Sequence, residues 1–250
     1  MDLVLFRDAL EHVTRIIRVI RQARGNMLCI GIGGSGRQSL SRLAAYICEF
    51  KVFQIEVTRN YRVQEFHEDI KRLYWMAGID NNPTVFLFND TQVVYESFLE
   101  DINNMLSSGQ VPNLYKADEL TEIQNELSPV MKKAGMDETP EKSFKFFIDR
   151  VRANLHIVLC MSPVGEAFRN RLRQYPSFIS STTIDLYTEW PADALLEVAE
   201  KYLAEVELGI SDQDIADKMR GQLAQVFSGL QLSIFGLFLI TKSYAYGGSG

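Results

Sequence analysis

Five short apolar segments, rich in β-branched and aromatic residues, constrain most strongly how this chain can fold. They are Met27–Ile32, Val52–Val57, Thr84–Phe88, Leu155–Met161 and Thr182–Tyr187. None alternates strictly between apolar and polar residues, and continuous apolar runs of this length indicate strands that are buried on both faces of a parallel sheet. Helical patterns fill the gaps between these segments. The alternation of strand and helix therefore predicts an α/β, doubly wound domain.

Two of the helical patterns are clear from their spacing. One follows the first predicted strand and the other follows the third, and their apolar residues recur at helical intervals: Leu40, Leu43, Ala44 and Ile47, then Phe98, Ile102, Met105 and Leu106. Residues 107–143 form a polar insert between the third and fourth strands, in which we expect one short helix near Asp118–Leu127 and a break at Ser128-Pro129. An insert of this length is usually functional or an interaction surface.

The pattern changes to helices alone after the fifth predicted strand. We expect residues 1–188 to form the α/β domain and residues 189–246 a smaller helical domain, which is incomplete or divergent. Its first helix follows Pro191 and its second begins at Ser211, while Phe235–Tyr246 shows no period and is expected to be irregular. Residues 247–250, Gly-Gly-Ser-Gly, resemble a linker.

A glycine-rich loop between the first strand and its helix carries the strongest functional signal. It comprises Gly31, Ile32, Gly33, Gly34, Ser35, Gly36, Arg37, Gln38 and Ser39. Such a loop turns backbone N–H groups and the positive end of a helix dipole outward, which suits phosphate. A purely structural glycine turn is the alternative. We expect phosphate binding because four glycines and a serine fall within six positions at a strand-to-helix junction.

The loop fits two phosphate-binding templates, and its position alone does not separate them. Gly31, Gly33 and Gly36 match the dinucleotide pattern G-x-G-x-x-G, and Glu56 closes the second strand where a ribose-binding carboxylate would stand. The same loop also fits a P-loop in which Arg37 replaces the usual Lys and Gln38 replaces the usual Ser or Thr.

The ends of the third and fourth strands favour the P-loop. The third strand ends in Asn89-Asp90, as a Walker B strand ends in acidic or polar residues, and the fourth ends in Ser162-Pro163. A small polar side chain at that edge is typical of a sensor for the γ-phosphate in P-loop ATPases. Taken alone, Ser162 can equally be an ordinary strand cap.

Composition excludes several other classes of function. Lys and Arg number 26 against 32 Asp and Glu, giving a net charge of −6, so nucleic acid is not expected as the main ligand. The three cysteines show no paired spacing, so neither a disulfide framework nor a zinc site is predicted. No signal peptide is expected, and the longest apolar run, residues 234–240, is shorter than the roughly 20 residues that cross a bilayer.

The sequence closely resembles the fourth AAA+ module of axonemal dynein heavy chains in five strings: Gly31–Leu40, Phe98–Asn104, Gly109–Tyr115, Asn154–Pro163 and Glu189–Pro191. The resemblance runs from about residue 1 to about residue 205. It implies a P-loop AAA+ large subdomain with strand order 5-1-4-3-2, a small helical subdomain and nucleotide between them. It also implies one sector of a six-module microtubule motor ring, with neighbouring AAA+ modules as partners, in the axoneme of cilia or flagella.

The motif residues depart from those of an active ATPase. Arg37 keeps the positive charge but not the geometry of Lys, and Gln38 is a poor ligand for Mg²⁺. In the alignment that the resemblance implies, Asn89 takes the place of the metal-binding Asp, and Asp90 takes the place of the Glu that orients water. Asp90 can instead act as a metal ligand, which leaves no base; either assignment predicts weak hydrolysis.

Two further positions matter under this resemblance. Ser181 stands where the fourth module of cytoplasmic dyneins carries an arginine finger, and a basic turn nearby comprises Arg169, Arg171 and Arg173. That turn is either a solvated helix face or a contact to a neighbouring module. The three histidines share no metal-ligand spacing and are expected to be structural.

The sequence thus predicts a module that binds ATP or ADP through Gly31, Gly33, Gly34, Ser35, Gly36, Arg37, Gln38 and Ser39, with Asn89, Asp90 and Ser162 at the γ-phosphate edge. Hydrolysis is expected to be weak or absent, and a requirement for Mg²⁺ is left open. The microtubule is expected to be a partner only through the whole motor, in the cytoplasm and cytoskeleton; neither nucleic acid nor membrane is expected. The alternatives are an NAD(P)-dependent oxidoreductase that uses Glu56, and an AAA+ spacer module without nucleotide.

Overall fold

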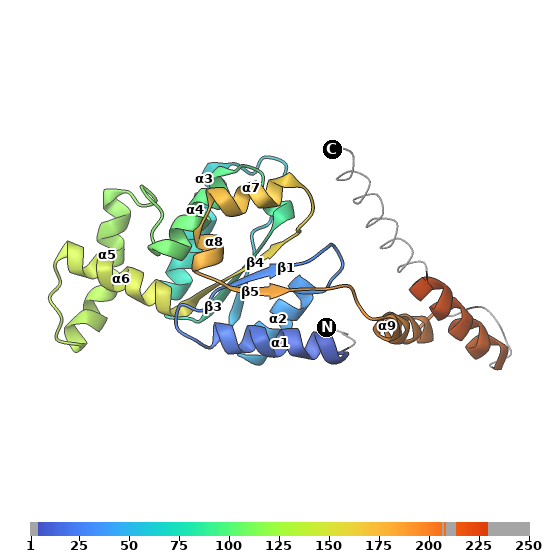
Figure 1. Cartoon of the computed structure of the whole chain (residues 1–250). Coiled ribbons are helices and arrows are strands. Elements are labelled where there is room, and N and C mark those ends of the chain that lie inside the picture. The colour runs from blue at the N-terminus through green and yellow to red at the C-terminus, as the bar shows by residue number, and fades with distance from the viewer. Residues whose placement is uncertain (1–4, 207, 209–213, 230–250) are drawn as a thin grey trace, which may run out of the picture. The chain divides into compact units, whose positions relative to one another are not determined.

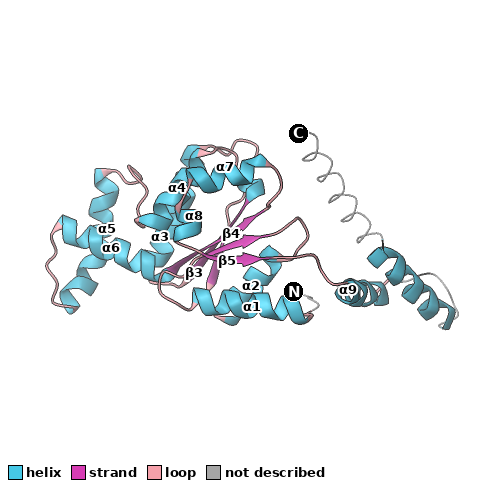
Figure 2. Cartoon of the chain, in the orientation of Figure 1, coloured by secondary structure: helices cyan, strands magenta, loops and turns pink. Residues whose placement is uncertain are grey.

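A five-stranded parallel sheet forms the centre of the fold in the computed structural model, which describes residues 5–206, 208 and 214–229. Its strands are β1 (Met27–Ile30), β2 (Lys51–Phe53), β3 (Thr84–Asn89), β4 (Leu155–Met161) and β5 (Thr183–Leu186). They are arranged in the order β2-β3-β4-β1-β5. This confirms the predicted order 5-1-4-3-2. Figure 2 shows the strands in magenta with helices around them. Every residue of β3 and β4 is buried, as their continuous apolar sequences predict.

Helices cover both faces of this sheet. Helices α1 (Arg7–Ile20) and α2 (Arg37–Ile47) lie on one side, and α4 (Ser97–Ser107), α7 (Glu166–Gln174) and α8 (Ser177–Ser180) lie on the other (Figure 1). An aromatic cluster forms the core, in which the ring of Phe66 stacks on that of Phe98 at 4.2 Å.

The segment between β2 and β3 contains one unusual helix. Here α3 (Val63–Tyr74) continues directly into the π-helix η1 (Trp75–Ile79). Gly78 in η1 packs so closely against α6 (Pro140–Asn154) that a Cβ atom at this position would lie 2.4 Å from the Phe147 ring. A side chain at this position would therefore clash with its neighbours.

The polar insert differs from its prediction. It folds into α5 (Ala117–Lys133), followed by α6 (Pro140–Asn154), and α5 runs through Pro129 instead of ending before it. The buried residues Ile123, Leu127 and Met131 continue one apolar stripe past the proline. Pro129 and Asn125, whose carbonyl loses its usual N–H donor, are both exposed, so water can hydrate that carbonyl.

The structure divides into two compact units, residues 8–188 and residues 1–7 with 189–250. In the second unit α9 (Ala192–Ala204) buries Leu195, as the helical pattern predicts, and residues 214–229 are also helical. In the helix over residues 214–229, Ile215, Met219 and Val226 are exposed while the small residues Ala216 and Ala224 are buried. Its predicted start at Ser211 and the irregular stretch 235–246 lie outside the described residues.

The strand β5 lies at one end of the sheet and presents two different faces. Asp185 is buried on the face covered by α1, where His12 Nδ1 and Arg15 Nη1 each lie 2.7 Å from its carboxylate. On its other face Ile184 and Leu186 are 44% and 62% exposed. None of the described helices is long and apolar enough to span a bilayer.

Candidate nucleotide site

The register of the sheet brings three chain segments to one edge. The glycine loop follows β1, Asp90 follows β3 and Ser162 follows β4, and β4 lies between the other two strands. The Gly31 N–H donates to the Met161 carbonyl at 3.1 Å, and the Ser162 N–H donates to Asp90 Oδ2 at 2.9 Å. The carboxyl ends of parallel strands are where α/β folds bind ligands.

The glycines of the loop serve two different purposes. A Cβ atom on Gly31 would lie 2.7 Å from Tyr187 Cβ and 2.8 Å from Ser35 Oγ, so the first glycine is needed for packing. Gly34 and Gly36 have φ angles of 81° and 84°, which only glycine adopts easily. Gly33 and Gly34 are exposed, and a Cβ on either would meet no atom within 4 Å, so their backbone faces open space.

Arg37 begins α2 and turns its guanidinium back toward the loop. Its Nη2 donates to the Ile32 carbonyl at 3.2 Å, whereas Nη1 is buried with no hydrogen-bond partner among the described residues. A buried charged donor without an acceptor is costly. A phosphate oxygen would satisfy it, since guanidinium groups match phosphate geometry well.

The residues that follow Arg37 are directed into the protein. Gln38 Oε1 accepts a hydrogen bond from Gln54 Nε2 at 3.4 Å, and Arg42 donates to the Oε1 of the same Gln54. Ser39 lies in the first turn of α2 and is partly buried. The side-chain oxygen of Gln38 therefore already accepts one hydrogen bond within the protein.

Asn89 is held by hydrogen bonds within the turn that follows β3. Asn89, which is buried, accepts hydrogen bonds from the backbone N–H of Thr91 at 3.0 Å and from its hydroxyl. Gln92 completes the turn, because its Oε1 accepts from the Asn89 N–H and its Nε2 donates to the Ile55 carbonyl at 2.6 Å. Thr91 and Gln92 are not among the residues predicted from the sequence, although Asn-x-Thr after a strand is a recognisable turn signal.

The described residues do not build a ready magnesium site. No group of three or more His, Cys, Asp or Glu residues with metal-binding geometry occurs among them. Gln38 and Asn89 are engaged as described above, and Asp90 receives the Ser162 N–H. Among Gln38, Asn89 and Asp90, Asp90 is the one that supplies a negative charge, and magnesium sites use several oxygen ligands.

The strand order does not fit the dinucleotide alternative. In a dinucleotide fold the second strand lies next to the first, so its carboxylate reaches the ribose. Here β3 and β4 separate β2 from β1, and Glu56 is an exposed residue beyond β2. The ribose-binding role considered for Glu56 is therefore not supported.

Ser181 and the three histidines lie away from the loop. Ser181 precedes β5 and accepts a hydrogen bond from Asn26 Nδ2 through its carbonyl, at the sheet edge opposite the glycine loop. His12 binds Asp185, His67 Nε2 lies 2.9 Å from Asp101, and His156 Nδ1 lies 2.9 Å from the Gly25 carbonyl. All three have protein partners, in agreement with their expected structural roles.

The basic turn belongs to α7. Arg171 donates through Nε and Nη2 to Glu96 Oε1, which ties α7 to the start of α4. Arg173 is exposed, and so is Arg169. This contact with Glu96 gives Arg171 a role within the module.

Comparison with known proteins is consistent with this geometry. Residues 1–238 match the family described as P-loop containing dynein motor region D4. The chain is 60% identical over 212 residues to the Dynein-1-beta heavy chain of the flagellar inner arm I1 complex of Chlamydomonas reinhardtii. It is 57% identical over 234 residues to Dynein axonemal heavy chain 2 of Mus musculus.

These matches cover 85% and 94% of the chain but only 5% of each relative. The S. cerevisiae Hsp104-ADP complex is similar with 13% identity and a TM-score of 0.48, over 84% of this chain and 31% of that chain. That structural likeness is too low to argue from.

Proposed function

Because the chain belongs to the family of the P-loop containing dynein motor region D4, we propose that it binds ATP or ADP as an AAA+ module of an axonemal dynein heavy chain, with little or no hydrolysis. The observation that carries this proposal is the open glycine loop, together with the buried Arg37 Nη1 that lacks an acceptor. Phosphate supplies that acceptor, and the exposed amides of Gly33 and Gly34 supply further donors.

The roles of the other residues follow from their contacts. Asn89, Asp90 and Ser162 stand at the γ-phosphate edge, but Asn89 is neutral and Asp90 already accepts a hydrogen bond. A base must reach the attacking water, and a carboxylate held by the Ser162 N–H is poorly placed to do so. We therefore assign the nucleotide a structural or regulatory role.

The assembly and location are proposed from the relatives. The chain spans about 5% of their length, so the remaining modules of the motor lie in the rest of the heavy chain. We propose that neighbouring AAA+ modules are its direct partners and that it meets microtubules only through the whole motor. Its proposed location is the cytoskeleton of the ciliary or flagellar axoneme.

A thermal-shift titration tests nucleotide binding. ATP or ADP should raise the melting temperature with or without Mg²⁺, since ligand at about 100 times Kd stabilises a protein by about 2.7 kcal/mol. Arg37→Ala should abolish the shift, whereas Arg18→Ala, which removes an exposed arginine on α1, should leave it unchanged. A shift with NAD alone would revive the oxidoreductase alternative, and no shift with any nucleotide would indicate a spacer module.

Measurement of phosphate release tests the proposal that the chain hydrolyses ATP slowly or not at all. The wild-type chain saturated with ATP and Mg²⁺ should release phosphate far more slowly than the roughly 10 per second of a median enzyme. Turnover near that rate would refute an impaired site even if binding is confirmed.

A further inference from the structure

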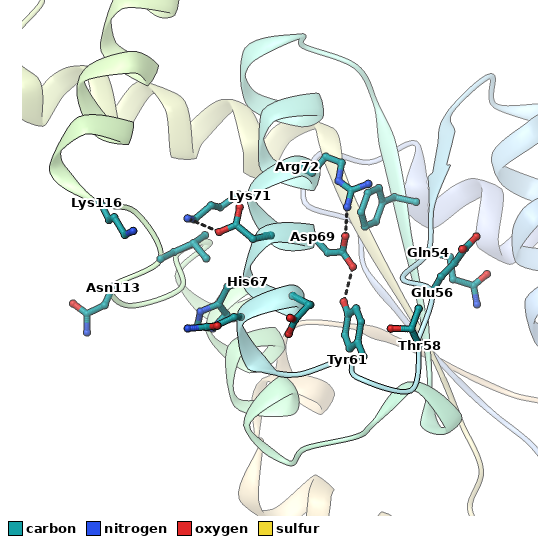
Figure 3. Close-up of a pocket in the computed structure, with 15 residues that line it drawn as sticks. Gln54, Glu56, Thr58, Tyr61, His67, Asp69, Lys71, Arg72, Asn113 and Lys116 are labelled. Carbon is teal, nitrogen blue, oxygen red and sulfur yellow. Dashed lines mark hydrogen bonds and ion pairs between the residues drawn. The ribbon is translucent and has the colours of Figure 1, made fainter.

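A surface groove on the outer side of α3 is separate from the nucleotide site. Its first half has a volume of about 1010 Å³ and is bounded by α3, the segment that follows β2 and the loop Asn113–Lys116 (Figure 3). Its second half, of about 730 Å³, is bounded by α3, η1 and the start of α5. Glu68, Lys71 and Arg72 line both halves, so the two halves adjoin each other along α3.

The walls of the groove are acidic. Seven carboxylates and three Lys or Arg side chains line the two halves. Glu56, Asp80 and Glu122 are exposed, and their side chains have no hydrogen-bond or ion-pair partner within the described part of the chain. They are spread over the segment after β2, the end of η1 and the first half of α5, which places free negative charge along the groove.

The cations on the walls are largely neutralised by their neighbours. Lys71 Nζ lies 2.9 Å from Glu68 and 2.6 Å from Glu119, and Arg72 is paired with Asp69 (Figure 3). Tyr61 donates to the same Asp69 at 2.5 Å, which fixes this carboxylate against α3. Lys116 is the exception, since it is exposed and makes no ion pair within the described residues.

The second half of the groove also offers apolar surface. Trp75 and Met76 in η1 line it with Tyr115, and all three are partly buried. The wall is well supported, because η1 packs onto α6 through Gly78 without room for a side chain. π-helical turns of this kind often occur at functional sites.

We propose that this groove docks a basic, amphipathic segment of polypeptide, with Lys or Arg side chains on the free carboxylates and apolar side chains on Trp75 and Met76. Charge complementarity selects such a partner over an acidic one and speeds its association. The combination of charged and apolar surface selects a polypeptide over a small cation, which would use only the carboxylates. This site is independent of nucleotide binding at the glycine loop.

Fluorescence anisotropy with a labelled peptide of repeated Lys-Leu-Ala tests the proposal on the full 250-residue chain. The peptide should bind with an affinity that falls as salt is added, and a Glu-Leu-Ala peptide should not bind. The combined variant Glu56→Gln, Asp80→Asn and Glu122→Gln should weaken binding by about tenfold, at the modest strength expected of three exposed ion pairs. Thermal melting verifies that this variant is folded.

The matched control is Glu126→Gln, Glu197→Gln and Glu200→Gln, three exposed helical carboxylates that lie outside the groove. It should bind the peptide like the wild type. Equal weakening in the control would show that only net charge matters and would overturn the proposal, as would no binding at all. Complete displacement of the peptide by spermidine at the same charge concentration would instead assign the groove to small cations.

Discussion

At the residue scale, Gln38 and Asn89 replace the residues of an active P-loop ATPase, and each is held by hydrogen bonds within the protein. Gln38 is bound by Gln54, and Asn89 caps the turn that contains Thr91. Motif spacing located these residues in the sequence, because a P-loop fixes the positions of its ligands. It could not supply the partner of Gln38, since Gln54 lies beyond the next strand and this hydrogen bond depends on the tertiary fold.

Restoring the usual metal ligands of a P-loop should therefore make nucleotide binding depend on Mg²⁺. In the variant Arg37→Lys, Gln38→Thr and Asn89→Asp, we expect Mg²⁺ to tighten ADP binding by about tenfold, because a hydroxyl and a carboxylate replace two amides that are engaged elsewhere. Isothermal titration of ADP with and without Mg²⁺ measures this change. Ser39→Thr alone should have no such effect, and an unchanged triple variant would show that other residues exclude the metal.

At the element scale, the sequence predicted the strands and the helices beside them because their apolar residues recur at clear intervals. The insert was predicted less well, since local preference at Ser128-Pro129 indicated a break while burial of Leu127 and Met131 favours one continuous helix. Tertiary packing overrides a local signal of this kind. The π-helix η1 has no period that a sequence pattern could reveal.

A substitution at Gly78 tests how tightly η1 packs against α6. Gly78→Ala should destabilise the protein by about 1–3 kcal/mol, because the new methyl group overlaps Phe147 and Val151. Urea unfolding measures the loss. In a Phe147→Leu background the same substitution should cost less, and an equal cost in both backgrounds would mean that the Phe147 contact is not the cause.

A substitution at Pro129 tests whether α5 is one continuous helix. Pro129→Ala should stabilise the protein by about 1–3 kcal/mol, since it restores the N–H that the Asn125 carbonyl lacks and removes the proline ring from a helix interior. Urea midpoints and helical circular dichroism report the change. A decrease in stability would indicate that the backbone geometry set by Pro129 is needed to pack the helix.

At the scale of the whole molecule, stability should fall on mild acidification. Burial lowers the pKa of His156 from its ordinary value of 6.5, although the Gly25 carbonyl opposes this. The unfolded chain therefore takes up a proton before the folded chain does, so stability is lost as the pH falls below about 6.5. Burial raises the pKa of Asp101, so its contribution has the opposite sign and lies in a more acidic window, above 3.8.

Urea unfolding between pH 7 and pH 5.5 measures the contribution of His156. The slope of unfolding free energy against pH should be smaller in His156→Gln than in the wild type, whatever the absolute stability of the variant. His67→Gln serves as the comparison, since His67 is part-exposed and bound to Asp101. Identical slopes in His156→Gln and the wild type would assign the acid sensitivity to another group.

The uncovered face of β5 bears on how the isolated chain behaves in solution. A terminal strand that exposes Ile184 and Leu186, and whose outer edge pairs with no other strand among the described residues, is a template for intermolecular strand pairing. Light scattering of purified chain should therefore rise with concentration, and Leu186→Lys should suppress it without lowering the melting temperature. When this module is expressed on its own, association of folded molecules would then limit the yield, rather than a failure to fold.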